Sequence, residues 1–167
     1  MKNLIFIGGP MGVGKTTVSK ELQKSLDSCV MLDGDWCWYT NPWILNQETR
    51  QIVMKNIKFM LNNYIQSESY KNIILCWVMH DDSIINEILN DLNLEDVNFT
   101  NVSLICSKEE LLKRLNEDIE NGLRTNIVIN RALVRLSQYD NVSSIHIDTT
   151  NKSVEDVKKE ILSHIGV

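Results

Sequence analysis

The sequence is poor in proline, with 2 residues in 167, and it lacks a long apolar run. The longest unbroken run, Ile73–Met79, has 7 residues, whereas a segment that crosses a bilayer needs roughly 20. No basic and apolar leader opens the chain, so we expect a cytoplasmic protein without a membrane partner. A chain of 167 residues fits a single domain, 1–167, with one core and one functional site.

Positive charge is also scarce. Lys and Arg total 17 against 22 for Asp and Glu, which gives a net charge of −5 and a pI of 5.2. This balance disfavours broad electrostatic attraction to DNA, RNA or acidic lipid, so we do not expect nucleic acid as a partner. The 4 cysteines lack the paired spacing of zinc or redox sites, and we interpret them as reduced thiols.

Short apolar segments alternate with amphipathic segments along the chain. The predicted strands cover residues 2–8, 28–32, 72–79, 100–106 and 144–147. The predicted helices start after Lys15 and then cover residues 47–67, 83–92, 108–121, 130–139 and 153–165. Ser107 and Ser153 each stand three residues before a carboxylate, which is typical of a helix start. The alternation predicts an α/β fold of three layers, with a five-stranded parallel sheet covered by helices on both faces.

Four of the 7 glycines fall between positions 8 and 14, directly between the first predicted strand and the first predicted helix. Gly9, Gly14, Lys15 and Thr16 match the spacing G-x-x-x-x-G-K-[ST]. In such a turn, successive backbone N–H groups point inward, the lysine reaches the outer phosphates and the hydroxyl coordinates Mg²⁺. The predicted nucleotide-binding residues are Gly9, Met11, Gly12, Val13, Gly14, Lys15, Thr16 and Thr17. The alternative is a glycine-rich turn that binds no ligand.

The second predicted strand is followed by two carboxylates, Asp33 and Asp35, separated by Gly34. They lie at the same edge of the predicted sheet as the glycine turn, because the carboxyl ends of parallel strands meet there. One carboxylate could hold Mg²⁺ and the other could accept a proton from an attacking hydroxyl, the two tasks that phosphoryl transfer requires. An Asp-Gly turn with two solvated acids is the alternative.

Four of the five arginines fall within 22 residues, at Arg114, Arg124, Arg131 and Arg135. Guanidinium groups stabilise the charge that spreads over a phosphoryl group during transfer. We predict a mobile lid at about residues 121–135, with Arg124 and Arg131 acting on the phosphates. For Arg114, a solvated helix position paired with Asp118 is an equal alternative.

Three tryptophans and a tyrosine crowd into eight residues directly after the carboxylates, at Trp36, Trp38, Tyr39 and Trp43. Such rings could stack on a planar or apolar acceptor, or they could form core beneath a helix end, and both interpretations stay open. We interpret Trp77, inside the third predicted strand, as a core residue. His80 could contact substrate, and Asp82 could assist a metal or, more simply, cap the next helix.

These motifs together resemble the P-loop small-molecule kinases, the group that contains shikimate kinase, gluconate kinase, adenylylsulfate kinase and chloramphenicol phosphotransferase. The resemblance rests on residues 9–16, on residues 33–35, on the arginine-bearing stretch after the fourth strand and on residues 147–150 before the last helix. It implies a sheet in the order 2-3-1-4-5, ATP on the glycine turn and an arginine lid. It also suggests Asp33 for the metal and Asp35 for the acceptor, although related kinases divide these roles differently.

We therefore expect a phosphotransferase that moves the γ-phosphate of ATP to a hydroxyl of a small molecule; the acceptor and the oligomeric state are open. The predicted catalytic residues are Lys15, Asp35, Arg124 and Arg131, and the predicted Mg²⁺ ligands are Thr16 and Asp33. ATP is favoured because no N-K-x-D motif that would read guanine is present. The third strand also lacks the usual aspartate, which leaves Asp33 as the metal carboxylate. The alternatives are a nucleotide-binding switch that transfers nothing, and a kinase of nucleotides or nucleic-acid ends.

Overall fold

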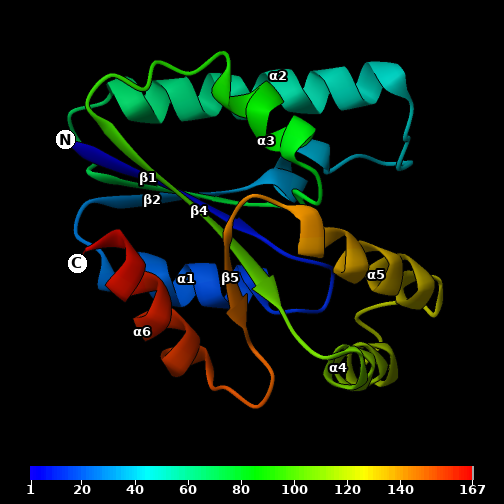
Figure 1. The fold of residues 1–167 in the computed structure, drawn as a ribbon. Helices are drawn as coiled ribbons and strands as arrows, with labels where there is room; N and C mark the ends of the chain where they lie inside the picture. The colour runs from blue at the N-terminus through cyan, green and yellow to red at the C-terminus, as the bar shows by residue number, and fades with distance from the viewer. Residues whose placement is uncertain (167) are drawn as a thin grey trace.

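In the computed structural model, which describes residues 1–166, strands and helices alternate along the chain (Figure 1). The strands are β1 (Lys2–Gly8), β2 (Cys29–Asp33), β3 (Asn72–Cys76), β4 (Val97–Ile105) and β5 (Ile145–Asp148). They form one parallel sheet in the order β2-β3-β1-β4-β5. The predicted α/β fold and its strand order are therefore confirmed.

Six helices cover the sheet and its carboxyl edge. They are α1 (Lys15–Ser25), α2 (Gln47–Gln66), α3 (Asp82–Leu89), α4 (Lys108–Glu120), α5 (Ile127–Gln138) and α6 (Val154–Ile165), with short 3₁₀ turns η1 (Gly34–Trp38) and η2 (Tyr139–Asn141). Figure 1 shows α2 and α3 on one face, α1 and α6 on the other, and α4 and α5 toward the end where the β4 arrow points. Within residues 1–166, no helix combines the length and the apolar character needed to cross a membrane.

The central strand supplies side chains to both hydrophobic layers. Leu4 and Phe6 of β1 pack in the layer beneath α2 and α3, whereas Ile5 and Ile7 pack in the layer beneath α1 and α6. All four side chains are fully buried. A parallel strand covered on both faces has no solvent-facing side, which explains why this segment is continuously apolar instead of alternating. The sheet is thus a rigid base whose carboxyl edge carries the loops.

Strand β3 ends three residues before its predicted end. Its last residue, Cys76, is the register partner of Asp33 in β2 and of Ile7 in β1. Both neighbouring strands end at or just after this level, so the strand pairing stops at Cys76, although Trp77 N still donates to Ile7 O at 3.2 Å. The apolar residues 77–79 therefore leave the sheet, although their composition is that of a strand.

The start of α3 differs from expectation. Asp81 caps the helix, and its side chain accepts a hydrogen bond from Ser83 N at 2.7 Å. Asp82 was expected in that role, but its carboxylate accepts hydrogen bonds from Ser143 N at 2.8 Å and Ser143 Oγ at 2.6 Å. Asp82 thus ties α3 to the segment before β5 instead of capping the helix.

Candidate active site

The glycine turn between β1 and α1 has a backbone that other residues would not adopt. Gly9 has φ 148°, and a Cβ on it would lie 2.7 Å from the carbonyl oxygen of Leu104 and 2.8 Å from Cγ1 of Val13. Helix α1 begins at Lys15 after Gly14, which offers no side-chain cap, and the first turn holds no acidic residue. The first N–H groups of α1 therefore stay available, and together with the helix dipole they attract an anion.

Lys15 lies in this turn with its ammonium folded back on the loop. Nζ donates a hydrogen bond to the carbonyl oxygen of Pro10 at 3.0 Å, and the described chain gives Lys15 no ion pair within 4.0 Å. Burial lowers the pKa of Lys15, against the opposing attraction of Asp35 and Asp33. A partly buried cation without an ion-pair partner gains from an incoming anion, as phosphate binding requires.

Asp33 is a buried carboxylate whose two oxygens already accept hydrogen bonds from the protein. Oδ2 accepts from Thr16 Oγ1 at 3.0 Å, and Oδ1 accepts from the backbone N of Asp35 at 3.1 Å. The sulfur of Cys76 lies 3.9 Å from Thr16 Oγ1. A hydroxyl and a carboxylate side by side are donors that Mg²⁺ favours. Residues 1–166 contain no group of three or more His, Cys, Asp or Glu side chains suited to a metal, so phosphates and water would complete such a site.

Asp35 lies in η1 and contacts a tryptophan from the segment directly after β3. The indole Nε1 of Trp77 donates a hydrogen bond to Asp35 Oδ1 at 3.2 Å. Partial burial and the charge of Asp33 raise the pKa of Asp35, although the Trp77 hydrogen bond opposes the shift. A Cβ at Gly34 would lie 2.4 Å from Cγ of Trp77, so only glycine permits this close approach of η1 to the indole.

These groups line one cavity of about 550 Å³. Its walls come from the glycine turn, the end of β2, the segment after β3, and α4 with the turn that follows it. The predicted site residues in the wall are Met11, Gly12, Gly14, Lys15, Thr16, Thr17, Asp33, Asp35 and Arg124. Two predicted residues of the turn stay outside the wall, because Gly9 packs on β4 and Val13 is buried in the core.

Of the two arginines predicted to act on phosphates, Arg124 lines the cavity and Arg131 does not. Arg124 lines the cavity, and its Nε lies 2.8 Å from Asp118 Oδ2 in a half-exposed ion pair. Arg131, predicted to act on phosphates, is exposed on α5 and does not line the cavity. Helix α5 packs through residues such as Ala132 and Leu136, which leaves Arg131 outside the site in this conformation.

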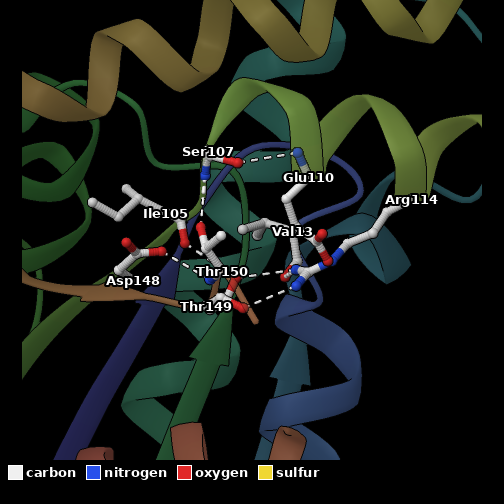
Figure 2. A network of polar contacts seen from close by, with 8 residues as sticks. All are labelled: Val13, Ile105, Ser107, Glu110, Arg114, Asp148, Thr149 and Thr150. Atoms are coloured by element: carbon white, nitrogen blue, oxygen red, sulfur yellow. Dashed lines mark hydrogen bonds and ion pairs between the residues drawn. The ribbon is translucent and has the colours of Figure 1, made fainter. Parts of the chain in front are cut away.

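Arg114 is a structural link, and its predicted alternative pairing with Asp118 is wrong. Its Nε donates to Glu110 Oε1 at 2.8 Å (Figure 2). Nη1 donates to Val13 O and to Thr149 Oγ1, each at 3.0 Å, and Nη2 donates to Thr149 O at 2.9 Å. One guanidinium thus fastens α4, the glycine turn and the segment after β5 to one another.

The segment after β5 is itself fixed by short hydrogen bonds. Figure 2 shows Thr150 between the ends of β4 and β5, where its Oγ1 accepts from Ser107 N at 2.8 Å and its N donates to Asp148 Oδ1 at 2.8 Å. The backbone N of Thr149 donates to Ile105 O at 2.8 Å. Hydrogen bonds within the protein therefore fix the segment after β5 beside the ends of β4 and β5.

The aromatic cluster after the carboxylates lies mostly outside the core, and Trp38 alone of the four rings packs against it. Trp36, Tyr39 and Trp43 are 57%, 96% and 55% exposed, and none of them lines the cavity. Trp38 is partly buried, packs against Trp43 with ring centroids 6.0 Å apart, and donates from Nε1 to the carbonyl oxygen of Ile44 at 3.2 Å. His80 is also absent from the cavity wall.

Sequence reasoning missed five residues of the cavity wall. They are Trp77, Val78, Glu117, Asp118 and Leu123. Trp77 was interpreted as core, but it is half-buried and faces Asp35. One signal for it was present, because residues directly after a strand of a parallel sheet lie at the edge that carries the phosphate turn.

The parallel sheet, the glycine turn and the paired carboxylates define a P-loop nucleotide-binding enzyme. The AAA domain family matches residues 5–146. Shikimate kinase of Bacillus cytotoxicus is 30% identical over 171 residues, which cover 97% of this chain and 98% of that protein. Shikimate kinase of Bacillus anthracis matches to the same extent, 30% over 171 residues with 97% and 98% covered. The chain therefore belongs to the P-loop small-molecule kinases, and it is a kinase that acts on a hydroxyl acceptor.

Solved structures share the fold at low sequence identity. The tunicamycin resistance protein of Deinococcus radiodurans has a TM-score of 0.72 at 17% identity, covering 100% of this chain and 97% of its own. A gluconokinase from Sinorhizobium meliloti 1021 has a TM-score of 0.72 at 16% identity, with 98% and 91% covered. Shikimate kinase from Aquifex aeolicus has a TM-score of 0.62 at 21% identity, with 98% and 96% covered. The architecture is thus common to kinases with different acceptors.

Proposed function

We propose that this kinase moves the γ-phosphate of ATP to a hydroxyl of a small molecule with the help of Mg²⁺. One observation carries the proposal: the hydrogen bond from Thr16 to Asp33, at 3.0 Å, joins the phosphate turn to the carboxylate pair in the same cavity. This contact supports the proposal, because a hydroxyl and a carboxylate that could hold Mg²⁺ then lie beside a second carboxylate that could serve as base.

The phosphate end of the cavity has the cationic and N–H groups that a triphosphate needs. The N–H groups of the turn and of the first turn of α1 would hold the phosphates, and Lys15 would leave the Pro10 carbonyl to pair with them. Thr16 and Asp33 would hold Mg²⁺, which neutralises phosphate charge when bound. Arg124 would exchange Asp118 for the transferred group as the turn at residues 121–126 closes as a lid.

Asp35 is the better candidate for the base, because its carboxylate has an oxygen to spare. Both oxygens of Asp33 accept hydrogen bonds from the protein, whereas Asp35 accepts a side-chain hydrogen bond on Oδ1 alone. The other oxygen, Oδ2, can take the proton of the attacking hydroxyl. The Trp77 hydrogen bond fixes the orientation of the carboxylate while this occurs.

The test is acceptor-dependent release of ADP from Mg-ATP, followed by mass spectrometry of the phosphorylated product. Shikimate, which the names of the relatives give as their acceptor, belongs in the first panel together with neutral hydroxyl compounds. We expect an acceptor in the panel to raise ADP release, and Lys15→Ala to abolish the effect. A protein that binds Mg-ATP but forms no phosphorylated product with any acceptor would instead be a nucleotide-binding switch.

A further inference from the structure

The end of the cavity beside Asp35, where the acceptor would bind, is lined by few kinds of side chain. Beside Asp35, the wall consists of Trp77 and Val78, the residues that leave the sheet after β3. The indole is held on one side by Gly34 and at its N–H by Asp35. A fixed aromatic side chain next to the carboxylate that receives the proton offers packing area and little charge.

The cations of the cavity are already engaged. Three cations and four acids line it, and the acids are Asp33, Asp35, Glu117 and Asp118. Arg114 is bonded to Glu110 and Thr149, and Arg124 is paired with Asp118. Lys15 serves the phosphates in the proposed function. Among residues 1–166, the cavity therefore has no cation left over for an acceptor.

We propose that the acceptor is an uncharged hydroxyl compound whose flat or apolar part packs against Trp77. This inference rests on the proposed function, since it names the substrate class of that site. A carboxylate on the acceptor would meet Asp35 and Asp33 without a free counter-cation, and like charges at short range oppose binding. An indole face, by contrast, gains from contact with a nucleobase or another planar ring.

A matched pair of compounds isolates the effect of a carboxylate charge on acceptor binding. Shikimate and its methyl ester have the same ring and hydroxyls and differ in the carboxylate charge. We would measure the binding of both by calorimetry to the whole protein, saturated with Mg²⁺ and a non-hydrolysable ATP analogue. We expect the ester to bind about tenfold or more tightly than the acid. Nucleosides and aromatic alcohols, which are neutral and planar, complete the panel, and we expect binding within it at millimolar concentration.

Substitutions at Trp77 test whether the acceptor packs against this side chain of the cavity wall. Trp77→Phe keeps a flat apolar ring, so acceptor affinity should stay within about threefold of the wild type, whereas Trp77→Ala should weaken it about tenfold or more. Trp43→Ala is the matched control, because this tryptophan is 55% exposed and outside the cavity wall. Its acceptor affinity should equal that of the wild type. Thermal unfolding of each variant establishes that it is folded.

The outcomes separate this inference from the proposed function. Tighter binding of shikimate than of its ester would overturn the inference, even if shikimate were phosphorylated. Absence of binding by every neutral planar compound, or equal affinity in wild type and Trp77→Ala, would also overturn it. Selective binding of neutral compounds without any phosphoryl transfer would support the inference on acceptor binding and refute the proposed transfer.

Discussion

At the scale of single residues, Asp35 combines the proposed role of base with a cost to stability. Its pKa is raised in the folded protein by partial burial and by Asp33. An acid whose folded pKa lies above the unfolded value, about 3.9, favours the protonated folded state. Its contribution to stability is therefore greatest below the unfolded pKa and declines as pH rises through the folded pKa. At neutral pH the charged form of Asp35 is thus a local destabilising group.

Replacing Asp35 with Asn should separate the two effects. The amide oxygen can still accept the Trp77 hydrogen bond, and the negative charge beside Asp33 is removed, so we expect a Tm at pH 7 equal to or above that of the wild type. Loss of the base should lower acceptor phosphorylation by about 10²-fold or more. Differential scanning calorimetry and the ADP-release assay measure both. A variant with wild-type turnover would assign the base elsewhere.

The pH dependence of turnover should also follow Asp35. The base must be ionised, so kcat/KM should fall on the acid side at a pH above the ordinary carboxyl range, because its pKa is raised. The Trp77 hydrogen bond favours the charged carboxylate, so Trp77→Phe should move this acid limb to still higher pH. Measurements of kcat/KM for the two proteins from about pH 4 to about pH 9 test this. An acid limb that stays in place would remove Trp77 from the positioning of Asp35.

The sequence predicted those residues whose spacing is fixed by local geometry. Lys15 and Thr16 follow from the glycine turn, and Asp33 and Asp35 follow from their place at the end of a strand. Trp77 could not be assigned in the same way, since an apolar run does not reveal where its neighbours stop pairing. Arg131 was inferred from clustering along the chain, but the packing of α5 decides its direction, and that depends on residues far away in sequence.

At the scale of elements, Arg114 is the contact that fixes the glycine turn to the rest of the nucleotide-binding edge. It bonds Glu110 in α4, the Val13 carbonyl in the turn, and Thr149 after β5. The sequence indicated a choice between Asp118 and phosphate for this arginine. A bond to a backbone carbonyl 101 residues away leaves no mark in the sequence.

Arg114→Ala should loosen all three elements together. The half-buried Glu110 and the Val13 carbonyl would lose their donor, so we expect a loss of about 2 kcal/mol or more in the free energy of unfolding. Mg-nucleotide affinity should fall as well, because the turn is less well fixed. Urea denaturation and calorimetric titration measure the two changes. The control is Lys24→Ala, which removes an exposed ion pair with Glu21 and should leave the free energy of unfolding nearly unchanged. Equal effects of both substitutions would contradict the structural role.

At the scale of the whole molecule, the parallel sheet is the base over which the proposed lid, the turn after α4, would close. Every strand is paired in parallel, and the central strand is fully buried in its middle. The strand order could be predicted through the resemblance to P-loop kinases, and the alternation of segments predicted the layers. Patterns of apolar residues do not encode where the proposed lid would lie when closed.

If the proposed lid closes over the cavity, substitutions of Arg124 and Arg131 should have different effects on turnover. In the present arrangement Arg124 lines the cavity in a half-exposed pair with Asp118, and such pairs contribute at most about 1 kcal/mol, so the guanidinium can move to a transferred phosphoryl group at little cost. Arg124→Ala should therefore leave the Tm and the affinity for Mg-ADP nearly unchanged while lowering kcat by about 10²-fold or more. Arg131→Ala, outside the cavity wall, should change none of the three quantities. Paired thermal-shift and turnover measurements decide this, and equal losses of kcat in both variants would mean that closure carries α5, with Arg131, into the site.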